Sequence, residues 1–283
     1  MAELGKLLTA VITPFDADGR VDEEAFVRVL QHVCEHGSDG VVACGSTGEA
    51  ATLSDEEHLR VVALAVENVP QGKTVIAGTG SNDTRHAVEL TERATALGVD
   101  AVLSVTPYYN RPDPRGLVAH YTEVARATDR PILLYNIPSR TGLDIPNDLL
   151  ARLGQIDGIV GVKQANDESL APIDGLELYA GNDNTFARVL DLGGAGGILV
   201  ASHVIGDLMR RLVDEPGRRA ELDATLQPVY AALGVHNPIP VKKACELLGL
   251  CSARLRLPLV EADEERTAIV REALERVGVL AAA

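Results

Sequence analysis

The sequence predicts a (β/α)8 barrel that carries a helical C-terminal extension. From the N-terminus to about residue 212, eight short apolar runs recur, and each is followed by a turn and a helical stretch. Eight such strand–helix units are typical of a closed parallel barrel. The runs do not alternate polar and apolar residues, as expected for strands buried on both faces. The eight runs are Leu7–Ile12, Gly40–Cys44, Thr74–Ala77, Ala101–Val105, Ile132–Tyr135, Ile159–Val162, Leu176–Ala180 and Gly197–Val200.

Helix boundary signals lie between these runs. The acidic stretch Asp22–Glu24 suits a helix N-terminus, where the helix dipole favours negative charge. Ser54 followed by Glu57 has the spacing of a capping box at the start of the second helix. Gly37 and Gly98 stand where the first and third helices are expected to end. A doubly wound sheet is the alternative, but it requires a nucleotide-binding fingerprint that the sequence lacks.

The strand signals end at about residue 215. We therefore expect a catalytic barrel over residues 1–215 and a helical domain over residues 216–283. The predicted C-terminal helices are Leu222–Leu233, Val241–Leu248 and Asp263–Val277, with Pro238, Pro240 and Pro258 as breaks.

The composition is typical of a folded, soluble protein and excludes several function classes. Of the 283 residues, 46% are hydrophobic and 24% are charged, and the formal net charge is −15. This acidic balance argues against nucleic-acid and anionic-membrane partners. No apolar stretch approaches the ~18 residues of a membrane span, and the N-terminus does not read as a secretory signal. The four cysteines form no Cys-x-x-Cys pair, so we expect mostly buried, reduced thiols in a cytoplasmic protein. They are Cys34, Cys44, Cys245 and Cys251.

Lys163 is the candidate nucleophile among only five lysines. It directly follows the sixth predicted strand, and barrel active sites collect at the C-terminal ends of the strands. Burial there would lower the lysine pKa and leave some neutral amine, which attack on a ketone requires. The alternative is a lysine that extends to solvent. The other four lysines lie near turns or in polar surroundings.

The segment Gly45–Glu49 follows the second strand and contains two hydroxyl side chains between glycines. Backbone amides exposed by glycine, together with hydroxyls, suit a carboxylate. The segment is not a P-loop, because no Gly-Lys-Ser/Thr follows it. A plain glycine-rich turn is the alternative.

Aromatic and basic residues follow the next strands. Tyr108 and Tyr109 come after the fourth strand, and Tyr135 and Arg140 come at the end of the fifth. A phenol can relay protons, and arginine binds carboxylates in a bidentate manner. The alternatives are an aromatic that packs a loop and a solvated arginine.

No metal site is expected. His32 and His36 lie four residues apart on the first helix, but no third ligand cluster accompanies them. A metal-free imine mechanism therefore fits better than a zinc-dependent aldol reaction.

Five segments together resemble the dihydrodipicolinate synthase/N-acetylneuraminate lyase family across essentially the whole chain. They are Gly45-Ser46-Thr47-Gly48-Glu49, Thr106-Pro107-Tyr108-Tyr109-Asn110, Tyr135-Asn136-Ile137-Pro138-Ser139-Arg140-Thr141-Gly142, Gly161-Val162-Lys163 and Asn237-Pro238-Ile239-Pro240-Val241-Lys242. The resemblance implies a homotetramer, built as a dimer of dimers, whose barrel subunits need no cofactor because the imine forms on Lys163.

The resemblance also implies roles for individual residues. Tyr135 would relay protons and be linked through Thr47 to Tyr109, which in this family reaches into the neighbouring subunit's site. The pyruvate carboxylate would bind at Gly45, Ser46 and Thr47. The main-chain carbonyl of Ile198 matches a position that the family uses beside the site.

Arg140 favours the synthase branch of the family, in which it would hold the carboxylate of the second substrate. The implied reaction is the lyase-class condensation of pyruvate with L-aspartate 4-semialdehyde to 4-hydroxy-tetrahydrodipicolinate, in lysine and diaminopimelate biosynthesis. Ser46, Asn182 and Leu199 depart from common synthase residues, and the last two are expected near the mouth. The alternatives are a 2-keto-3-deoxy sugar-acid aldolase, an N-acetylneuraminate lyase and a catalytically silent binding homologue.

The resemblance finally implies a degenerate effector site for lysine. Its positions here are Ala50, Ala51, His58, Asn82, His86 and Tyr108. His86 replaces a glutamate that pairs with the effector's ammonium group. The loss of a charge-assisted hydrogen bond of ~1.5–3 kcal/mol lowers affinity roughly 10- to 150-fold, so we expect weak or absent inhibition by lysine.

Overall fold

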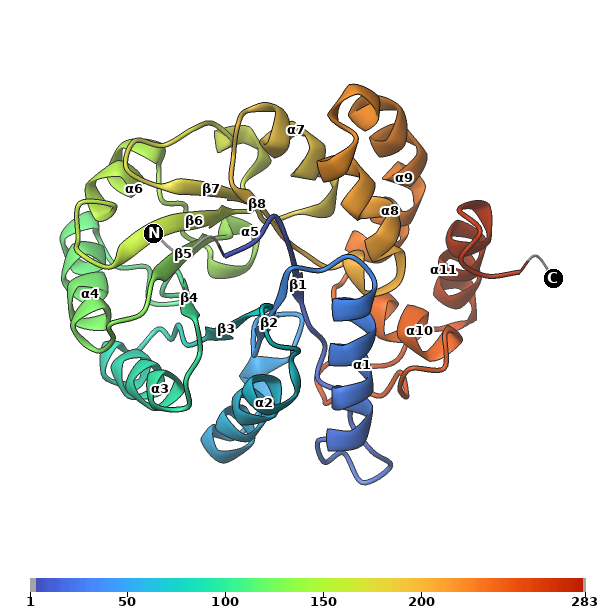
Figure 1. Ribbon diagram of the computed structural model, residues 1–283. Helices are drawn as coiled ribbons and strands as arrows, with labels where there is room; N and C mark the ends of the chain where they lie inside the picture. The colour runs from blue at the N-terminus through green and yellow to red at the C-terminus, as the bar shows by residue number, and fades with distance from the viewer. Residues whose placement is uncertain (1–3, 282–283) are drawn as a thin grey trace.

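Eight parallel strands close into a barrel in sequence order, with helices around the outside, in the computed structural model of residues 4–281 (Figure 1). All eight predicted strands are present, with ends within two residues of the predicted ones. The strands are β1 Leu7–Ala10, β2 Gly40–Ala43, β3 Thr74–Gly78, β4 Ala101–Val105, β5 Ile132–Asn136, β6 Ile159–Gln164, β7 Glu177–Ala180 and β8 Gly196–Leu199. The predicted fold class is therefore confirmed.

The α-helices are α1 Glu23–Glu35, α2 Asp55–Asn68, α3 Thr84–Ala96, α4 Pro114–Arg126, α5 Pro138–Thr141, α6 Asn147–Leu153, α7 Phe186–Asp191, α8 Ser202–Asp214, α9 Arg219–Gly234, α10 Ile239–Leu247 and α11 Glu264–Arg276. Four short 3₁₀ helices are η1 Ala50–Thr52, η2 Asp167–Ser169, η3 Asp183–Thr185 and η4 Pro216–Arg218. None of the helices in residues 4–281 has the length and apolar character needed to span a membrane.

The predicted helix boundaries have the expected local chemistry. Asp22 caps α1 by accepting a hydrogen bond from a backbone N–H of its first turn. Ser54 and Glu57 form the reciprocal capping box at the start of α2. Gly37 and Gly98 follow α1 and α3 with φ of +90° and +93°, a backbone region that favours glycine.

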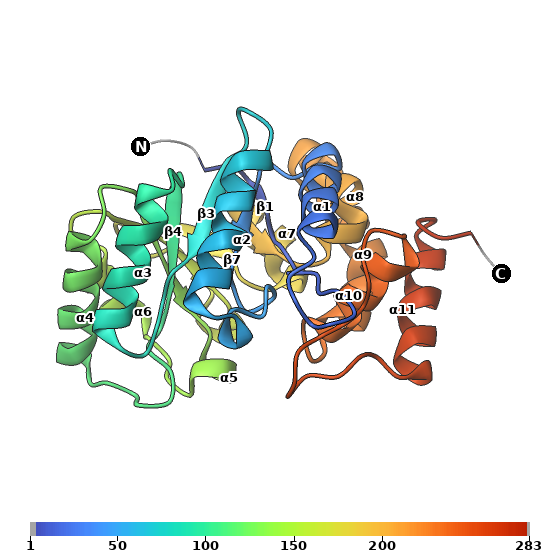
Figure 2. The same cartoon turned by 90° about the horizontal axis from the view of Figure 1, so that it is seen from below.

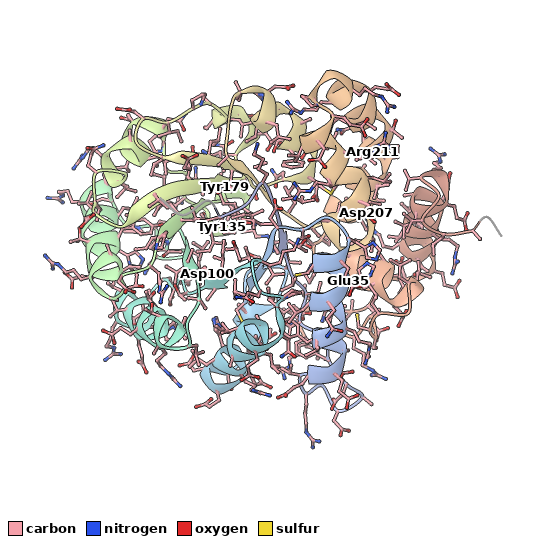
Figure 3. All side chains as sticks on the ribbon, viewed as in Figure 1. Glu35, Asp100, Tyr135, Tyr179, Asp207 and Arg211 are labelled. Carbon is pink, nitrogen blue, oxygen red and sulfur yellow. The ribbon has the colours of Figure 1, made fainter. Side chains whose placement is uncertain are left out.

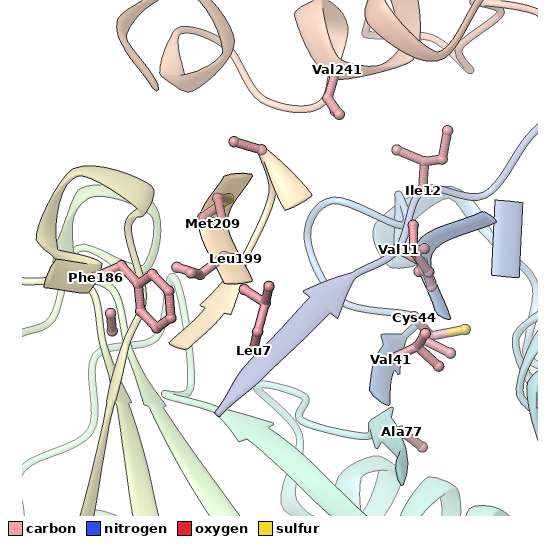
Figure 4. Close-up of a cluster of buried hydrophobic side chains, with 14 of the residues drawn as sticks. Leu7, Val11, Ile12, Val41, Cys44, Ala77, Phe186, Leu199, Met209 and Val241 are labelled. Carbon is pink, nitrogen blue, oxygen red and sulfur yellow. The ribbon is translucent and has the colours of Figure 1, made fainter. Parts of the chain in front are cut away.

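The hydrophobic core has two parts. An inner cluster fills the barrel, and a larger one lies between the strands and the helices. The outer cluster continues into the C-terminal helices, where Val241 of α10 faces the barrel side chains (Figure 4). The predicted division at residue 215 falls just after α8, and this division into two domains stays a prediction.

The C-terminal helices lie at one side of the barrel, beside α1 and α8 (Figure 2). All three predicted helices form, but Pro240, one of the three prolines predicted as breaks, does not act as one. Pro240 lies in the first turn of α10, where the missing N–H is not needed. Pro228 lies inside α9.

The strand register sets the level of the key side chains. Tyr135 on β5 pairs with Lys163 on β6, and Lys163 pairs with Tyr179 on β7. Neighbouring residues in register point to the same side of a sheet. The three side chains therefore lie at one level of the barrel.

Candidate active site

Lys163 lines a cavity of about 500 Å³ at the C-terminal ends of the strands. The walls come from strand-end loops of the barrel and from α9 with the segment that follows it. The lining residues are Thr47, Tyr135, Ile137, Ser139, Arg140, Lys163, Gly181, Asn182, Asp183, Asn184, Val200, Gln227, Tyr230, Ala231, Leu233, Gly234 and Asn237.

The Lys163 amine is placed for nucleophilic attack. The residue is only 5% exposed, and its Nζ lies 4.3 Å from the centre of the Tyr135 ring. Burial lowers the pKa of Lys163 to about 7, although the negative charge of Asp183 opposes the shift. A substantial neutral fraction of the amine is therefore present near neutral pH.

Tyr135 lies inside the ring of strands, as does Tyr179 (Figure 3). Burial raises the pKa of Tyr135 to about 12, while the positive charge of Arg140 and a hydrogen bond with Ser46 act against the rise. The phenol therefore stays protonated near neutral pH and can donate a proton to a neighbouring oxygen.

The predicted carboxylate-binding segment divides between two adjoining cavities. Thr47 is 3% exposed and lines the cavity of Lys163. Gly45 and Ser46 line a second cavity of about 500 Å³. Tyr135 and Arg140 line both cavities, so the segment still faces the same site.

Arg140 lies on the short helix α5 at the mouth. Its Nη2 donates to the main-chain oxygen of Asn237 at 2.9 Å. The helix ends at Gly142, whose φ of +71° is a left-handed conformation that glycine adopts without strain. The guanidinium has further N–H groups that can donate hydrogen bonds to a substrate carboxylate.

Three predicted residues do not line either cavity of the single chain. Tyr109 is 90% exposed and has φ of +71°, so it does not reach the cavity of its own subunit. The side chain of Ile198 is fully buried in the inner barrel cluster, and the role expected for its main-chain carbonyl stays a prediction. Leu199 is the last residue of β8 and so lies near the mouth, as expected, but its side chain packs in the outer cluster with Phe186 and Met209 (Figure 4).

Several residues of the cavity had no role assigned from the sequence, Asp183 and Asn237 among them. Asp183 is 9% exposed, and its Oδ1 accepts the backbone N–H groups of Val200 and Ala201 at 3.0 Å each. Burial raises the pKa of Asp183, and these N–H groups and Lys163 oppose that shift. Its place after the seventh strand was the available signal. Asn237 lies on no barrel strand, and its signal was the segment Asn237–Lys242, one of the five that carry the family resemblance.

Asn182 also lines the cavity, but its side chain is already engaged. Its Nδ2 donates to Asp167 Oδ1 at 2.7 Å, and Asn184 donates to the other oxygen of the same carboxylate at 3.3 Å. Asn182, which departs from the common synthase residue, therefore forms a polar part of the cavity wall whose side chain is held in place.

Five of the six predicted effector positions line the second cavity. They are Ala50, Ala51, His58, His86 and Tyr108, whereas Asn82 is absent from that lining and its carbonyl accepts from Asn110 at 2.7 Å. His86 Nε2 lies 3.0 Å from Asp55 Oδ1, and Asp55 lines the same cavity. The second cavity therefore contains the Asp55 carboxylate, which is already paired with His86.

The burial of Lys242 was not expected from the sequence. Its side chain is fully buried, with Nζ 2.5 Å from Glu49 Oε1 and 4.2 Å from the centre of the Phe15 ring. Cys44 is buried as expected, and burial raises the pKa of its thiol. Among residues 4–281, no three histidine, cysteine or acidic side chains form a metal-binding group.

Comparisons with known proteins agree with this geometry. The model of the dihydrodipicolinate synthetase family matches residues 3–277. The chain is 42% identical to 4-hydroxy-tetrahydrodipicolinate synthase of Methanosarcina barkeri, covering 96% of this chain and 98% of the relative. The enzyme of that name from Moorella thermoacetica is 41% identical, with 98% and 99% covered.

Solved structures agree as well. The chloride-inhibited dihydrodipicolinate synthase of Acinetobacter baumannii complexed with pyruvate has a TM-score of 0.93, 36% identity, and coverage of 98% of this chain and 100% of that chain. The synthase of Cyanidioschyzon merolae with lysine bound has a TM-score of 0.92, 35% identity, and coverage of 99% and 100%. The chain therefore belongs to the dihydrodipicolinate synthetase family.

Proposed function

We propose that this protein is a 4-hydroxy-tetrahydrodipicolinate synthase, which condenses pyruvate with L-aspartate 4-semialdehyde. The observation that carries the proposal is the buried Lys163 amine, with a pKa lowered to about 7, beside Tyr135 in a closed-barrel cavity. Relatives that carry this enzyme name match nearly the full length of the chain.

The first half of the reaction is imine formation. The neutral Lys163 amine attacks the ketone carbon of pyruvate, and water leaves as the imine forms. Tyr135, whose phenol is protonated near neutral pH, supplies the proton that the departing oxygen needs. Ser46 and Thr47 hold the pyruvate carboxylate. The buried Asp183 carboxylate stabilises the positive charge of the iminium form.

The second half forms the carbon–carbon bond. Loss of a methyl proton converts the imine into an enamine, which attacks the aldehyde carbon of the second substrate. Arg140 holds the carboxylate of that substrate at the mouth. The substrate's own amine then displaces Lys163 by transimination, which closes the ring and frees the enzyme.

Activity in this proposal depends on a homotetramer, arranged as a dimer of dimers. Tyr109 is 90% exposed on a loop with a left-handed backbone, which suits insertion into a neighbouring subunit. The chemistry uses no metal or organic cofactor, because the electron sink is the imine on Lys163. The cytoplasmic location expected from the cysteine pattern stays a prediction.

The decisive experiment is condensation of pyruvate with L-aspartate 4-semialdehyde, coupled to a reductase and followed as NADPH loss. Turnover near the enzyme median of ~10 per second supports the synthase. Borohydride reduction with pyruvate alone should add one reduced pyruvate to Lys163. An adduct without turnover would redirect the proposal to sugar-acid substrates, and no adduct at all would favour a catalytically silent homologue.

A further inference from the structure

Asn237 joins the C-terminal part of the chain to two residues of the candidate site. It lies between α9 and α10, outside the barrel strands. Its Nδ2 donates to Thr47 Oγ1 at 2.9 Å, and its main-chain oxygen accepts from Arg140 Nη2 at 2.9 Å. It also lines both cavities. One residue therefore contacts both side chains that we assign to the two substrate carboxylates.

The hydrogen bond constrains the direction of the Thr47 hydroxyl. A hydroxyl has one proton and two lone pairs, and the amide of Asn237 occupies one lone pair. The Thr47 proton is then free to be donated to another acceptor in the cavity. The other amide atom, Oδ1, is buried without a hydrogen-bond partner among residues 4–281. A reversed amide would bury its N–H donors instead of this single acceptor, so the observed orientation is the better one.

We propose that Asn237 is a positioning residue, whose side-chain amide keeps the Thr47 hydroxyl as a donor toward the bound pyruvate. The proposal rests on the proposed function, because it assigns the acceptor to pyruvate or to its imine. Thr47 is only 3% exposed, so its contact with the Asn237 amide is shielded from bulk solvent. The hydroxyl direction is therefore set by a residue 190 positions away in the chain.

The two contacts of Asn237 are chemically separable. The contact with Arg140 uses the main-chain oxygen, and a side-chain substitution leaves that oxygen in place. The contact with Thr47 uses the side chain alone. An Asn237→Ala variant should therefore affect pyruvate more than the semialdehyde. We expect KM for pyruvate to rise about 10-fold and KM for the semialdehyde to stay within about 3-fold, by the usual size of a lost charge-assisted contact.

The Asn237→Asp variant tests whether the Asn237 side chain acts through the direction of its hydrogen bond or only by filling space. The carboxylate has nearly the shape of the amide but has no N–H, so Thr47 must donate its proton to the new carboxylate. We expect this variant to lose about 10²-fold in the rate of borohydride-trapped adduct formation, more than Asn237→Ala loses. If Asn237 only fills space, the order reverses, because alanine leaves the larger void.

A double-mutant cycle with Thr47→Val tests whether Asn237 acts through the hydroxyl. In the Thr47→Val background, we expect either Asn237 variant to cost no more than about 2-fold further in the trapping rate. If an Asn237 variant lowers the trapping rate equally in the native and the Thr47→Val backgrounds, the proposal is overturned. Such a result would mean that the variant acts through a new charge or a general distortion, neither of which needs the Thr47 hydroxyl. Asn147→Asp is the matched control, since that side chain donates to the main-chain oxygen of Ser169, lines neither cavity and should leave the trapping rate unchanged.

The trapping measurement separates this proposal from the proposed function. It needs only pyruvate, so it reports on Asn237 and Thr47 even if the semialdehyde is the wrong second substrate. Melting temperatures of all variants should agree within a few degrees. A variant that loses activity only in proportion to lost folded protein would count against a positioning role.

Discussion

Glu49 and Lys242 form an almost completely buried ion pair, with side-chain exposures of 1% and 0% and a separation of 2.5 Å. Glu49 ends the loop that carries Thr47, and Lys242 lies on α10. Lys242 also donates to the main-chain oxygen of Arg254 at 2.7 Å. The pair therefore fixes the Gly45–Glu49 loop of the barrel to the C-terminal helices.

Removing one partner of this pair should be strongly destabilising. Lys242→Met leaves the Glu49 carboxylate buried without its counter-charge, and we expect the free energy of unfolding to fall by about 3–5 kcal/mol. Urea denaturation measures the change. Lys243→Met is the matched control, because its pair with Glu246 is partly exposed and should contribute about 1 kcal/mol or less. Similar losses in the two variants would contradict the interpretation.

Imine formation should depend on pH through Lys163. Burial lowers the pKa of Lys163 to about 7, and only the neutral amine attacks pyruvate. The trapping rate should therefore rise with pH and level off above pH 7, with about a tenfold fall for each pH unit below the pKa. Asp183→Asn should move the midpoint to lower pH, because the Asp183 charge raises the pKa of Lys163. A midpoint above pH 9 would contradict this account.

The buried His203 should make the fold sensitive to acid. Its Nδ1 donates to the Val200 carbonyl at 2.7 Å, and its Nε2 accepts from the Ile12 N–H at 3.1 Å, which requires the neutral ring. Burial lowers the pKa of His203 to about 4, below its ordinary value of 6.5. The contribution of neutral His203 to the free energy of unfolding is therefore fully present above pH 6.5 and is lost as the pH falls toward 4.

The expected loss from His203 over that range is about 3 kcal/mol. Unfolding free energies in urea at several pH values measure it. In His203→Gln the acid-induced slope should decrease by about one proton. An unchanged slope in His203→Gln would show that other groups control acid sensitivity.

Inhibition by lysine should be weak. The Asp55 carboxylate in the second cavity is already paired with His86, at 3.0 Å. His86→Glu adds an acceptor for an ammonium group, and we expect lysine to inhibit this variant at roughly 10- to 150-fold lower concentration. Arg85→Glu, which adds an acid to an exposed position of α3, is the control and should not do so. Half-maximal inhibition of the unaltered enzyme at micromolar lysine would disprove the expectation.

Tyr109 should act across a subunit interface. If each site uses Lys163 of one subunit and Tyr109 of another, subunits with Lys163→Met and subunits with Tyr109→Ala are each impaired alone. Random mixing should then restore about a quarter of the native sites, since about half of the pairs are hybrids with one intact site each. Activity after denaturation and refolding of the mixture measures this. No recovery from a folded mixture would place Tyr109 outside the neighbouring site.

Apolar patterning determined the barrel. The eight runs are buried on both faces, so continuous apolar strands and amphipathic helices were enough to predict the strand order and the outer helices. The same topology places the C-terminal ends of all eight strands at one mouth of the barrel. The position of Lys163 at the C-terminal end of the sixth strand was therefore sufficient to expect it in a site, and motif spacing was sufficient to suggest the family.

Tertiary structure alone decided which side chains control that lysine and the loop around it. Asp183 beside Lys163, Asn237 on Thr47 and Lys242 on Glu49 join residues from separate elements. Sequence patterning records the face that each element buries, but it carries no signal for a single polar contact between residues nearly 200 positions apart. Such contacts depend on how the C-terminal helices dock on the barrel, because that docking removes water and leaves each polar group only its protein partner.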